Sequence, residues 1–198
     1  MKLRLLALTL LLSLPVAAFA QHTPPAAAPG GATAPAEAKQ FDFMLGQWEL
    51  EVRPKVSGLA AMIHGAPKLV GTWKAWRVLD GLGIEDEMRI VDASGNPLSL
   101  NRALRIYSKG EARWQVSGVD AYRGRISASS GTMQGAEMHM DGQFVDPQDK
   151  PTLTRTRYFD IGADGFRMQQ DRSTDNGQSW DEGVLTIDAK RTAATATP

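Results

Sequence analysis

Apolar and polar residues alternate one by one through many short stretches of this chain. Apolar side chains fall on every second position over residues 48–52, and the same period recurs over 73–79 and 84–91. A period of two is typical of a β-strand whose two faces meet different environments. Seven further stretches have the character of strands: Leu100–Lys109, Ala112–Gly118, Arg123–Ser129, Thr132–Met140, Leu153–Ile161, Gly165–Asp171 and Gly183–Asp188. The pattern predicts an all-β domain of about ten strands.

Residues that favour tight turns separate these stretches. The clearest turn pairs are Asp80-Gly81, Ser130-Gly131, Asp141-Gly142 and Asn176-Gly177. Gly, Asn and Asp adopt the positive φ values that hairpins require. Successive hairpins give an antiparallel up-and-down meander, and closing it into a β-barrel removes the exposed edges. A two-sheet sandwich is the alternative. Residues 54–67 lack alternation, so we expect a loop or a short helix there that covers one end of the barrel.

The first twenty residues have the pattern of a cleavable export signal. Lys2 and Arg4 precede the apolar stretch Leu5–Leu12, and Ala18-Phe19-Ala20 is a small-x-small site, so we expect cleavage after Ala20. The alternative is a membrane anchor, but the apolar run is shorter than the roughly 20 residues that a spanning helix needs. No later segment is long and apolar enough for stable membrane insertion. The sequence therefore predicts a periplasmic or secreted protein.

Two further segments differ in composition from the predicted strands. Residues 21–39 consist mostly of Pro, Ala and Gly and contain no large apolar residue. Such a segment buries too little surface to offset its ordering entropy, so we expect a flexible linker. Residues 189–198 end in small side chains and are expected to form a disordered tail. The predicted β-barrel domain is thus residues 40–188.

Charge and cysteine content exclude several classes of function. Removal of Lys2 and Arg4 with the signal leaves 20 basic side chains against 22 acidic ones, a formal charge of −2. That balance argues against binding to nucleic acid or to an anionic membrane surface. The chain contains no cysteine, which excludes disulfides, lipid attachment at a cysteine, thiolate metal sites and cysteine nucleophiles.

One motif gives a resemblance to a known family. Residues 41–48 read FDFMLGQW, similar to the FDF-x-x-G-x-W opening of the DUF1579 family of secreted bacterial proteins of unknown function. The downstream segments agree with that family, and they are D-G-x-G-I-x-D-E-x-R at Asp80–Arg89, L-R-I-Y at Leu104–Tyr107 followed by Trp114, and S-x-D-x-G-x-x-W at Ser173–Trp180. The G-x-W element is similar to that of lipocalins and other calycin-like barrels. The resemblance implies a lipocalin-like or nitrobindin-like barrel.

Several residues of these motifs are expected to have structural roles. Gly46 permits close backbone approach, and Trp48 supplies a large apolar plug whose indole N–H needs a partner. An arginine from elsewhere in the chain could stack on the Trp48 ring. Phe41, the first residue of the motif FDFMLGQW, is expected to have a structural role as well.

The segment Ser173–Trp180 resembles the Asp-box hairpin of sialidases and other β folds. Asp175 can accept backbone N–H bonds, Gly177 can take positive φ, and Trp180 can pack under the hairpin.

Polar residues on otherwise apolar strand faces are the candidate ligand site. If those faces point inward, Asp86, Arg105, Tyr107 and Arg157 form a polar cluster in an apolar cavity, and we include Trp114 in the same predicted set. The alternatives are satisfied ion pairs in the core, since arginine suits buried pairs, or the reverse facing with these residues in water.

The sequence predicts no metal and no cofactor. Its histidines are His22 in the linker, His64 in the irregular segment and His139 in a strand, and none matches a C-terminal proximal haem ligand. Two usable histidines without cysteine make a weak zinc site. Glu85, Asp86 and Glu87 are consecutive in a strand, so Asp86 faces away from the other two.

Three functions are compatible with this pattern. The first is a periplasmic lipocalin-like protein that binds a small, mostly apolar ligand inside the barrel. The second is a barrel enzyme of isomerase, cyclase or hydratase type, which requires Asp86 or Tyr107 beside Arg105 in a pocket. The third is a structural envelope protein without a ligand, whose interior would be packed like a solid core.

Overall fold

The computed structural model describes residues 33–56, 65–145 and 151–193, and in them ten β-strands and three short 3₁₀-helices. The strands are β1 Gly46–Pro54, β2 Leu69–Val78, β3 Gly83–Asp92, β4 Pro97–Ser108, β5 Arg113–Asp120, β6 Arg125–Gln134, β7 Glu137–Val145, β8 Pro151–Phe159, β9 Gly165–Ser173 and β10 Asp181–Ala193. The helices are η1 Ala36–Lys39, η2 Asp42–Met44 and η3 Leu79–Gly81. Of the irregular segment predicted at 54–67, residues 57–64 lie outside the described part.

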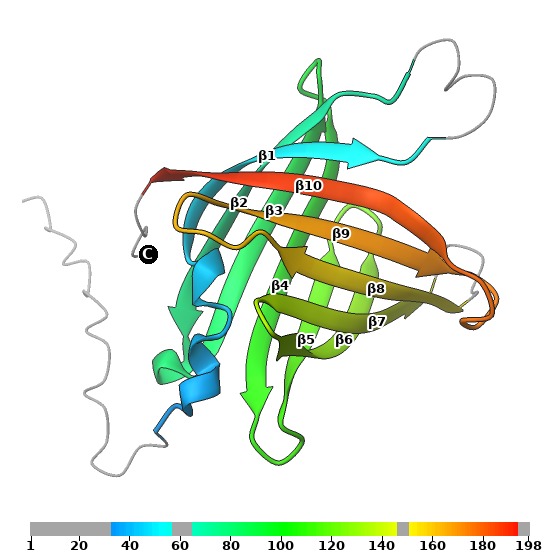
Figure 1. The fold of residues 1–198 in the computed structure, drawn as a ribbon. Coiled ribbons are helices and arrows are strands. Elements are labelled where there is room, and N and C mark those ends of the chain that lie inside the picture. Colours follow the sequence, from blue (N-terminus) through cyan, green and yellow to red (C-terminus); the bar gives the residue numbers. More distant parts are fainter. Residues whose placement is uncertain (1–32, 57–64, 146–150, 194–198) are drawn as a thin grey trace, which may run out of the picture. The chain divides into compact units, whose positions relative to one another are not determined.

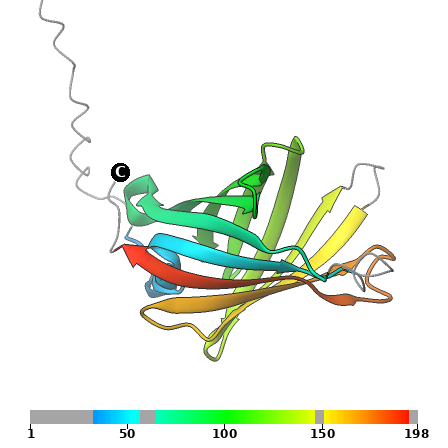
Figure 2. The ribbon, with the colours of Figure 1, turned by 90° about the horizontal axis from the view of Figure 1, so that it is seen from above.

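The strands form a closed antiparallel barrel in which every neighbour in sequence is also a neighbour in space (Figures 1 and 2). The first and last strands close it, because β10 pairs with β1 while β1 also pairs with β2. This confirms the predicted up-and-down barrel of ten strands and excludes the sandwich.

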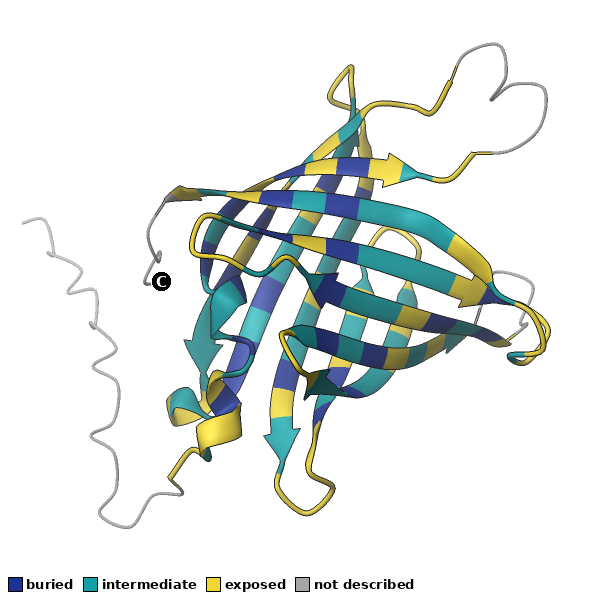
Figure 3. Cartoon of the chain, viewed as in Figure 1, coloured by how far each residue is buried: buried dark blue, intermediate teal, exposed yellow. Residues whose placement is uncertain are grey.

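Burial alternates along the strands, as Figure 3 shows by its bands of colour. In β1 the buried side chains are Trp48, Leu50 and Val52, with exposed Glu49 and Glu51 between them. The approach between strands is closest at Gly131, where an added Cβ would lie 1.9 Å from the carbonyl oxygen of His139, and at Gly71, where it would lie 2.2 Å from that of Arg89. The alternation therefore divides each strand into an inner and an outer face.

The segment before β1 closes one end of the barrel. Helices η1 and η2 lie at this end, near the turn between β2 and β3 (Figure 1). They bury Phe41 and Met44 almost completely. Gly46 has a φ of 114°, a value that favours glycine, and it leads the chain into β1. The Nε1 of Trp48 donates to the Met44 carbonyl oxygen at 2.7 Å, so the indole N–H is satisfied inside the core.

Two arginines fasten this closing segment to the barrel. Arg77 donates to the Ala38 carbonyl oxygen at 2.9 Å and pairs with Asp42. Arg191 donates to the Leu45 carbonyl oxygen at 2.7 Å, and its guanidinium carbon lies 3.9 Å from the centre of the Trp48 ring. Arg191 is thus the arginine that stacks on Trp48.

The domain is longer at both ends than predicted. Residues 36–39, assigned to the linker, form η1 and bury Ala38 under the barrel. Residues 189–193, assigned to the tail, belong to β10, because Trp48 pairs with Arg191 and Gln47 with Ala193 in closing the barrel. The export signal at 1–20, residues 21–32 and residues 194–198 lie outside the described part, so those assignments stay predictions. No helix of the described residues is long and apolar enough to cross a membrane.

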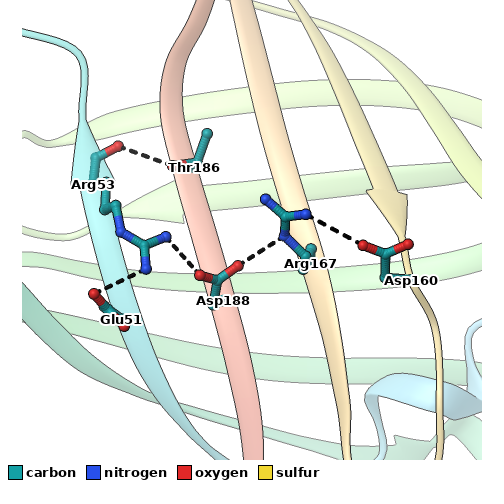
Figure 4. Close-up of polar contacts among 6 residues, drawn as sticks. All are labelled: Glu51, Arg53, Asp160, Arg167, Thr186 and Asp188. Atoms are coloured by element: carbon teal, nitrogen blue, oxygen red, sulfur yellow. Dashed lines mark hydrogen bonds and ion pairs between the residues drawn. The ribbon is translucent and has the colours of Figure 1, made fainter.

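The outer face has a ladder of alternating charges that runs across β1, β10 and β9 to the residue that follows β8 (Figure 4). It consists of Glu51, Arg53, Asp188, Arg167 and Asp160. The central carboxylate accepts from Arg53 at 2.5 Å and from the Arg167 Nε at 2.9 Å. These side chains are roughly one-third to two-thirds exposed, so water screens the pairs. We call this set the outer ladder.

Candidate functional site

The half of the barrel away from η1 and η2 contains a cavity of about 800 Å³. That volume falls in the range of small-molecule sites, roughly 300–1,000 Å³. Lining residues extend from the middle of the barrel to the far strand ends, where Pro54, Asp120 and Arg172 lie. The ligand-free hypothesis requires an interior that is packed throughout like a solid core, and this cavity contradicts that requirement.

A polar cluster forms the inner end of the cavity, and we call it the floor cluster: Trp73 of β2, Asp86 of β3, Arg105 of β4 and Tyr158 of β8. The Arg105 Nε donates to one Asp86 oxygen at 2.8 Å, and the Trp73 indole N–H donates to the other at 2.8 Å. These four residues are each at most 5% exposed. Both carboxylate oxygens of Asp86 thus have a partner.

Burial and neighbouring charges fix the protonation states of this cluster. Burial lowers the pKa of Arg105, but its electrostatic interactions and hydrogen bonds with Asp86 and Tyr158 outweigh the burial, so the pKa lies above its ordinary value. Burial raises the pKa of the Tyr158 phenol, Asp86 adds to the rise, and Arg105 opposes it without cancelling it. At neutral pH the cluster therefore holds a guanidinium and a neutral phenol.

An aromatic layer supports the floor cluster from the closed end. The Arg105 guanidinium lies over the Phe41 ring, 5.0 Å from its centre. Phe41 also meets the edges of Trp114 and Tyr158, with ring centres 4.9 and 5.8 Å away. The Trp114 Nε1 in turn donates to the Gln40 side chain at 3.1 Å. This layer holds the guanidinium in place from below while the cavity lies above it.

The cavity walls differ in chemistry. Hydroxyl side chains of two strands line one side, and they are Ser127 and Ser129 of β6 with Thr152, Thr154 and Thr156 of β8. Between them lies Gly142 of β7, where an added Cβ would be 2.8 Å from the Thr154 hydroxyl. Apolar side chains line the opposite strands, and they are Val52, Leu69, Met88, Ile90 and Leu185. A ligand here meets hydrogen-bonding groups on one side and hydrocarbon on the other.

The cavity reaches the far strand ends between arginines. Arg123 pairs with Asp120 at 2.6 Å, and the Arg125 guanidinium lies 4.4 Å from the centre of the Phe144 ring. Arg172 of β9 also lines this end. The entrance therefore has a positive character beside an aromatic surface.

Only two of the five predicted ligand residues, Asp86 and Arg105, line the cavity. Trp114 is fully buried in the closed-end core, and Tyr107 packs on it with ring centres 5.8 Å apart. Arg157 points outward, 41% exposed, stacks on Phe159 and lies 3.5 Å from Glu137. The enzyme hypothesis required Asp86 or Tyr107 beside Arg105 in a pocket. Asp86 lies there, whereas Tyr107 does not line the cavity and Tyr158 is the tyrosine of the floor cluster.

Sequence reasoning missed Trp73 and Tyr158. In β8 the inner face is Thr152, Thr154, Thr156 and Tyr158, one residue out of step with the predicted face of Arg157 and Phe159. Moving a strand's facing by one residue exchanges all its inner and outer side chains. The signal that could have found Tyr158 is a hydroxyl side chain at every second position of β8, from Thr152 through Thr154 and Thr156 to Tyr158.

The turn from β9 to β10 is held by its own polar groups. Asp175 accepts from the Ser179 backbone N–H at 2.9 Å and from the Ser173 hydroxyl at 2.7 Å. Hydrogen bonds from the Ser179 side chain and backbone and from Ser173 lower the pKa of Asp175 to about 2. Gly177 has a φ of 86°, and the Arg155 guanidinium stacks on Trp180 at 3.8 Å. These residues shape the turn.

No three metal-binding side chains come together in the part of the chain that the structure describes. His139 is on β7 with its ring 3.1 Å from the Glu137 carboxylate, and its side chain is 38% exposed. His22 and His64 lie outside the described residues.

Comparisons with known proteins give no family. No family model and no curated protein matches the sequence, so the likeness to DUF1579 remains a resemblance. Among solved structures, EF1p2_mFAP2b bound to DFHBI is 8% identical with a TM-score of 0.39, covering 79% of this chain and 100% of that one. A redesigned beta barrel is 9% identical with a TM-score of 0.41, covering 81% of this chain and 100% of that one. The case for a function therefore depends on the cavity itself.

Proposed function

We propose that this protein binds a small amphipathic organic molecule inside the barrel. The observation behind the proposal is the cavity of about 800 Å³ above a polar floor in which both oxygens of Asp86 accept hydrogen bonds. A stable protein rarely leaves such a volume open, because interiors are otherwise close-packed. The sequence suggested a mostly apolar ligand, and the hydroxyl side chains of β6 and β8 narrow this to a molecule with one polar side.

Native mass spectrometry of protein purified from its own cell envelope tests this proposal. We expect a co-purified mass that organic extraction removes. The variant Ser129→Phe places a ring inside the cavity and should abolish the adduct, whereas Ser130→Phe, on the outer face of the same strand, should retain it. Equal adducts in both variants would show that the molecule binds elsewhere.

We further propose that the protein works outside the cytoplasm after cleavage behind Ala20. The support is the sequence of residues 1–20, with its basic start, apolar centre and small-x-small end. Intact-mass analysis of the exported protein should give a chain that begins at Gln21. Recovery of a full-length chain in the cytoplasmic fraction would contradict the proposal.

A further inference from the structure

The floor cluster offers hydrogen-bond donors to the cavity. Arg105 uses its Nε for Asp86, and no other acidic group of the described residues lies within 4.0 Å of its guanidinium. In the same residues no fully buried polar side-chain atom lacks a partner. The two terminal amino groups of Arg105 are therefore open to the cavity, which Arg105 lines together with Tyr158, and their N–H groups can donate to a ligand.

The same cluster has few acceptors to offer. Asp86 uses one oxygen for Trp73 and the other for Arg105. The Tyr158 phenol stays protonated at neutral pH, because burial raises its pKa. A ligand atom that reaches the floor therefore meets N–H and O–H donors, and an accepting oxygen fits them.

Charge at the floor favours a neutral oxygen over a carboxylate. Asp86 and Arg105 neutralise each other at 3% and 5% exposure. A second carboxylate would leave one negative charge in excess at a site nearly removed from water, which is strongly unfavourable. A carbonyl oxygen accepts the same hydrogen bonds without adding charge.

From this geometry we propose that the ligand carries a neutral carbonyl group that enters first and accepts hydrogen bonds from Arg105 and Tyr158. Its hydrocarbon part then lies along the apolar strands, with Met88, Ile90 and Leu185. The inference rests on the proposed binding function and adds the chemical class and the orientation of the ligand. Ketones, esters, amides and quinones share the required group.

Three probes of equal length test the inference, and they are 2-nonanone, nonane and nonanoate. A hydrogen bond from a charged donor contributes about 1.5–3 kcal/mol, so the ketone should bind roughly 10-fold or more tightly than the alkane. Nonanoate should bind more weakly than the ketone. The infrared C=O stretch of bound 2-nonanone should move to lower wavenumber than in hexane, as expected for an oxygen that accepts hydrogen bonds.

Matched variants test which side chains produce the preference for 2-nonanone over nonane. Tyr158→Phe removes one hydroxyl and should reduce the affinity for 2-nonanone several-fold without changing that for nonane. Tyr107→Phe, in the closed-end core away from the cavity, should change neither. Because Arg105 replacements alone leave Asp86 without its cation, the double variant Asp86→Asn with Arg105→Met keeps the floor neutral. It should retain nonane binding and lose the preference for the ketone.

The outcomes separate the inference from the proposed function. If the ketone and the alkane bind equally, or nonanoate binds most tightly, the carbonyl assignment is wrong while the binding barrel stands. If Tyr158→Phe weakens both neutral probes alike, the tyrosine is only structural and the assignment is also wrong. If no probe binds at all, the proposed binding function fails and the assignment fails with it.

Discussion

The two faces of the wall formed by β3 and β4 place the same residue types in opposite environments. Inside, Asp86 and Arg105 pair at 2.8 Å with side chains 4% and 6% exposed. Outside, the adjacent Glu85 pairs with Arg102 at 2.6 Å with side chains 29% and 55% exposed, and Arg102 lies over Trp76. The distances are nearly equal, so distance alone says little about what each pair contributes.

Solvent makes the difference between these pairs. The outer pair gains little because water screens it and two long side chains must be held in place. The inner pair was removed from water at a large cost, so breaking it exposes an uncompensated charge to a poorly solvated interior. We therefore expect that removing one partner of the inner pair destabilises the fold strongly, and that the outer pair is dispensable.

The largest expected effect is from Asp86→Ala. This change leaves Arg105 without its anion and the Trp73 indole N–H without its acceptor, and we expect the free energy of unfolding to fall by about 3–5 kcal/mol. Glu85→Ala, one residue away on the outer face, should cost at most about 1 kcal/mol. Urea denaturation followed by tryptophan fluorescence measures both. Similar losses for the two variants would contradict the comparison.

A second, smaller effect is expected at the closed end. Arg191 has carbonyl oxygens rather than carboxylates as partners, at 2.7 Å from Leu45 and 2.7 Å from Ala163, and it stacks on Trp48. Arg191→Met keeps an unbranched apolar chain but loses the charged hydrogen bonds, and we expect a loss of about 2 kcal/mol in thermal or urea unfolding. Lys190→Met, on the adjacent exposed position, is the control and should be close to neutral.

The outer ladder should show its contribution through pH. Partial burial raises the pKa of Asp188, but hydrogen bonds and charges from Arg53 and Arg167 outweigh it and hold the pKa below its ordinary value of 3.8. A lowered pKa means that the stabilisation is present above pH 3.8 and is lost as pH falls through the folded-state value.

We therefore expect Asp188→Asn to lower the melting temperature at pH 7 by at most about 2–4 °C, with the difference from the unmodified protein shrinking below pH 3.8. Calorimetric melting curves between pH 7 and pH 2.5 measure this. A difference that grows toward acid pH would mean that the carboxylate is not stabilised by its arginines.

The smallest expected effect is that of salt on the stability, and it distinguishes the exposed pairs from the buried pair most clearly. At 1 M NaCl the Debye length is about 3 Å, so exposed pairs are largely screened whereas the buried pair is not. The stability difference between Asp188→Asn and the unmodified protein should nearly vanish in 1 M NaCl, while that of Asp86→Ala should persist. Equal salt sensitivity of the two would show that water reaches the floor cluster.

Most of the fold was predictable from the sequence, because alternation and turn residues are local signals. Two of the predicted turns were wrong, because Ser130-Gly131 lies within β6 and Asp141-Gly142 within β7. The ten strands, their antiparallel order and the opposite facing of Asp86 and its neighbours Glu85 and Glu87 all follow from a period of two. The ends of the domain were not predictable from the sequence, because Ala38 and Arg191 are ordered by partners that are far away in sequence.

The candidate site was predictable only in part. Asp86 and Arg105 stand out as charges between apolar neighbours, whereas Tyr158 belongs to a strand with no strong apolar face. The inner side of β8 consists of threonines up to Tyr158, and its outer side includes Phe159. The pattern therefore predicted the wrong face of β8 to point inward. Inside the barrel Ser127 lies opposite Gly118, and Ser129 and Thr154 lie opposite Gly142, pairings that local sequence does not reveal.

The amino-acid sequence by itself determined the strand periodicity, several of the turns and the motif around Gly46 and Trp48, since these depend on residues close together in the chain. Only the tertiary structure decided which face of each strand points inward and that the barrel is closed by β1 and β10. It also decided that a cavity remains above Arg105 and Tyr158. The physical reason is that enclosed volume and desolvation depend on all ten strands together.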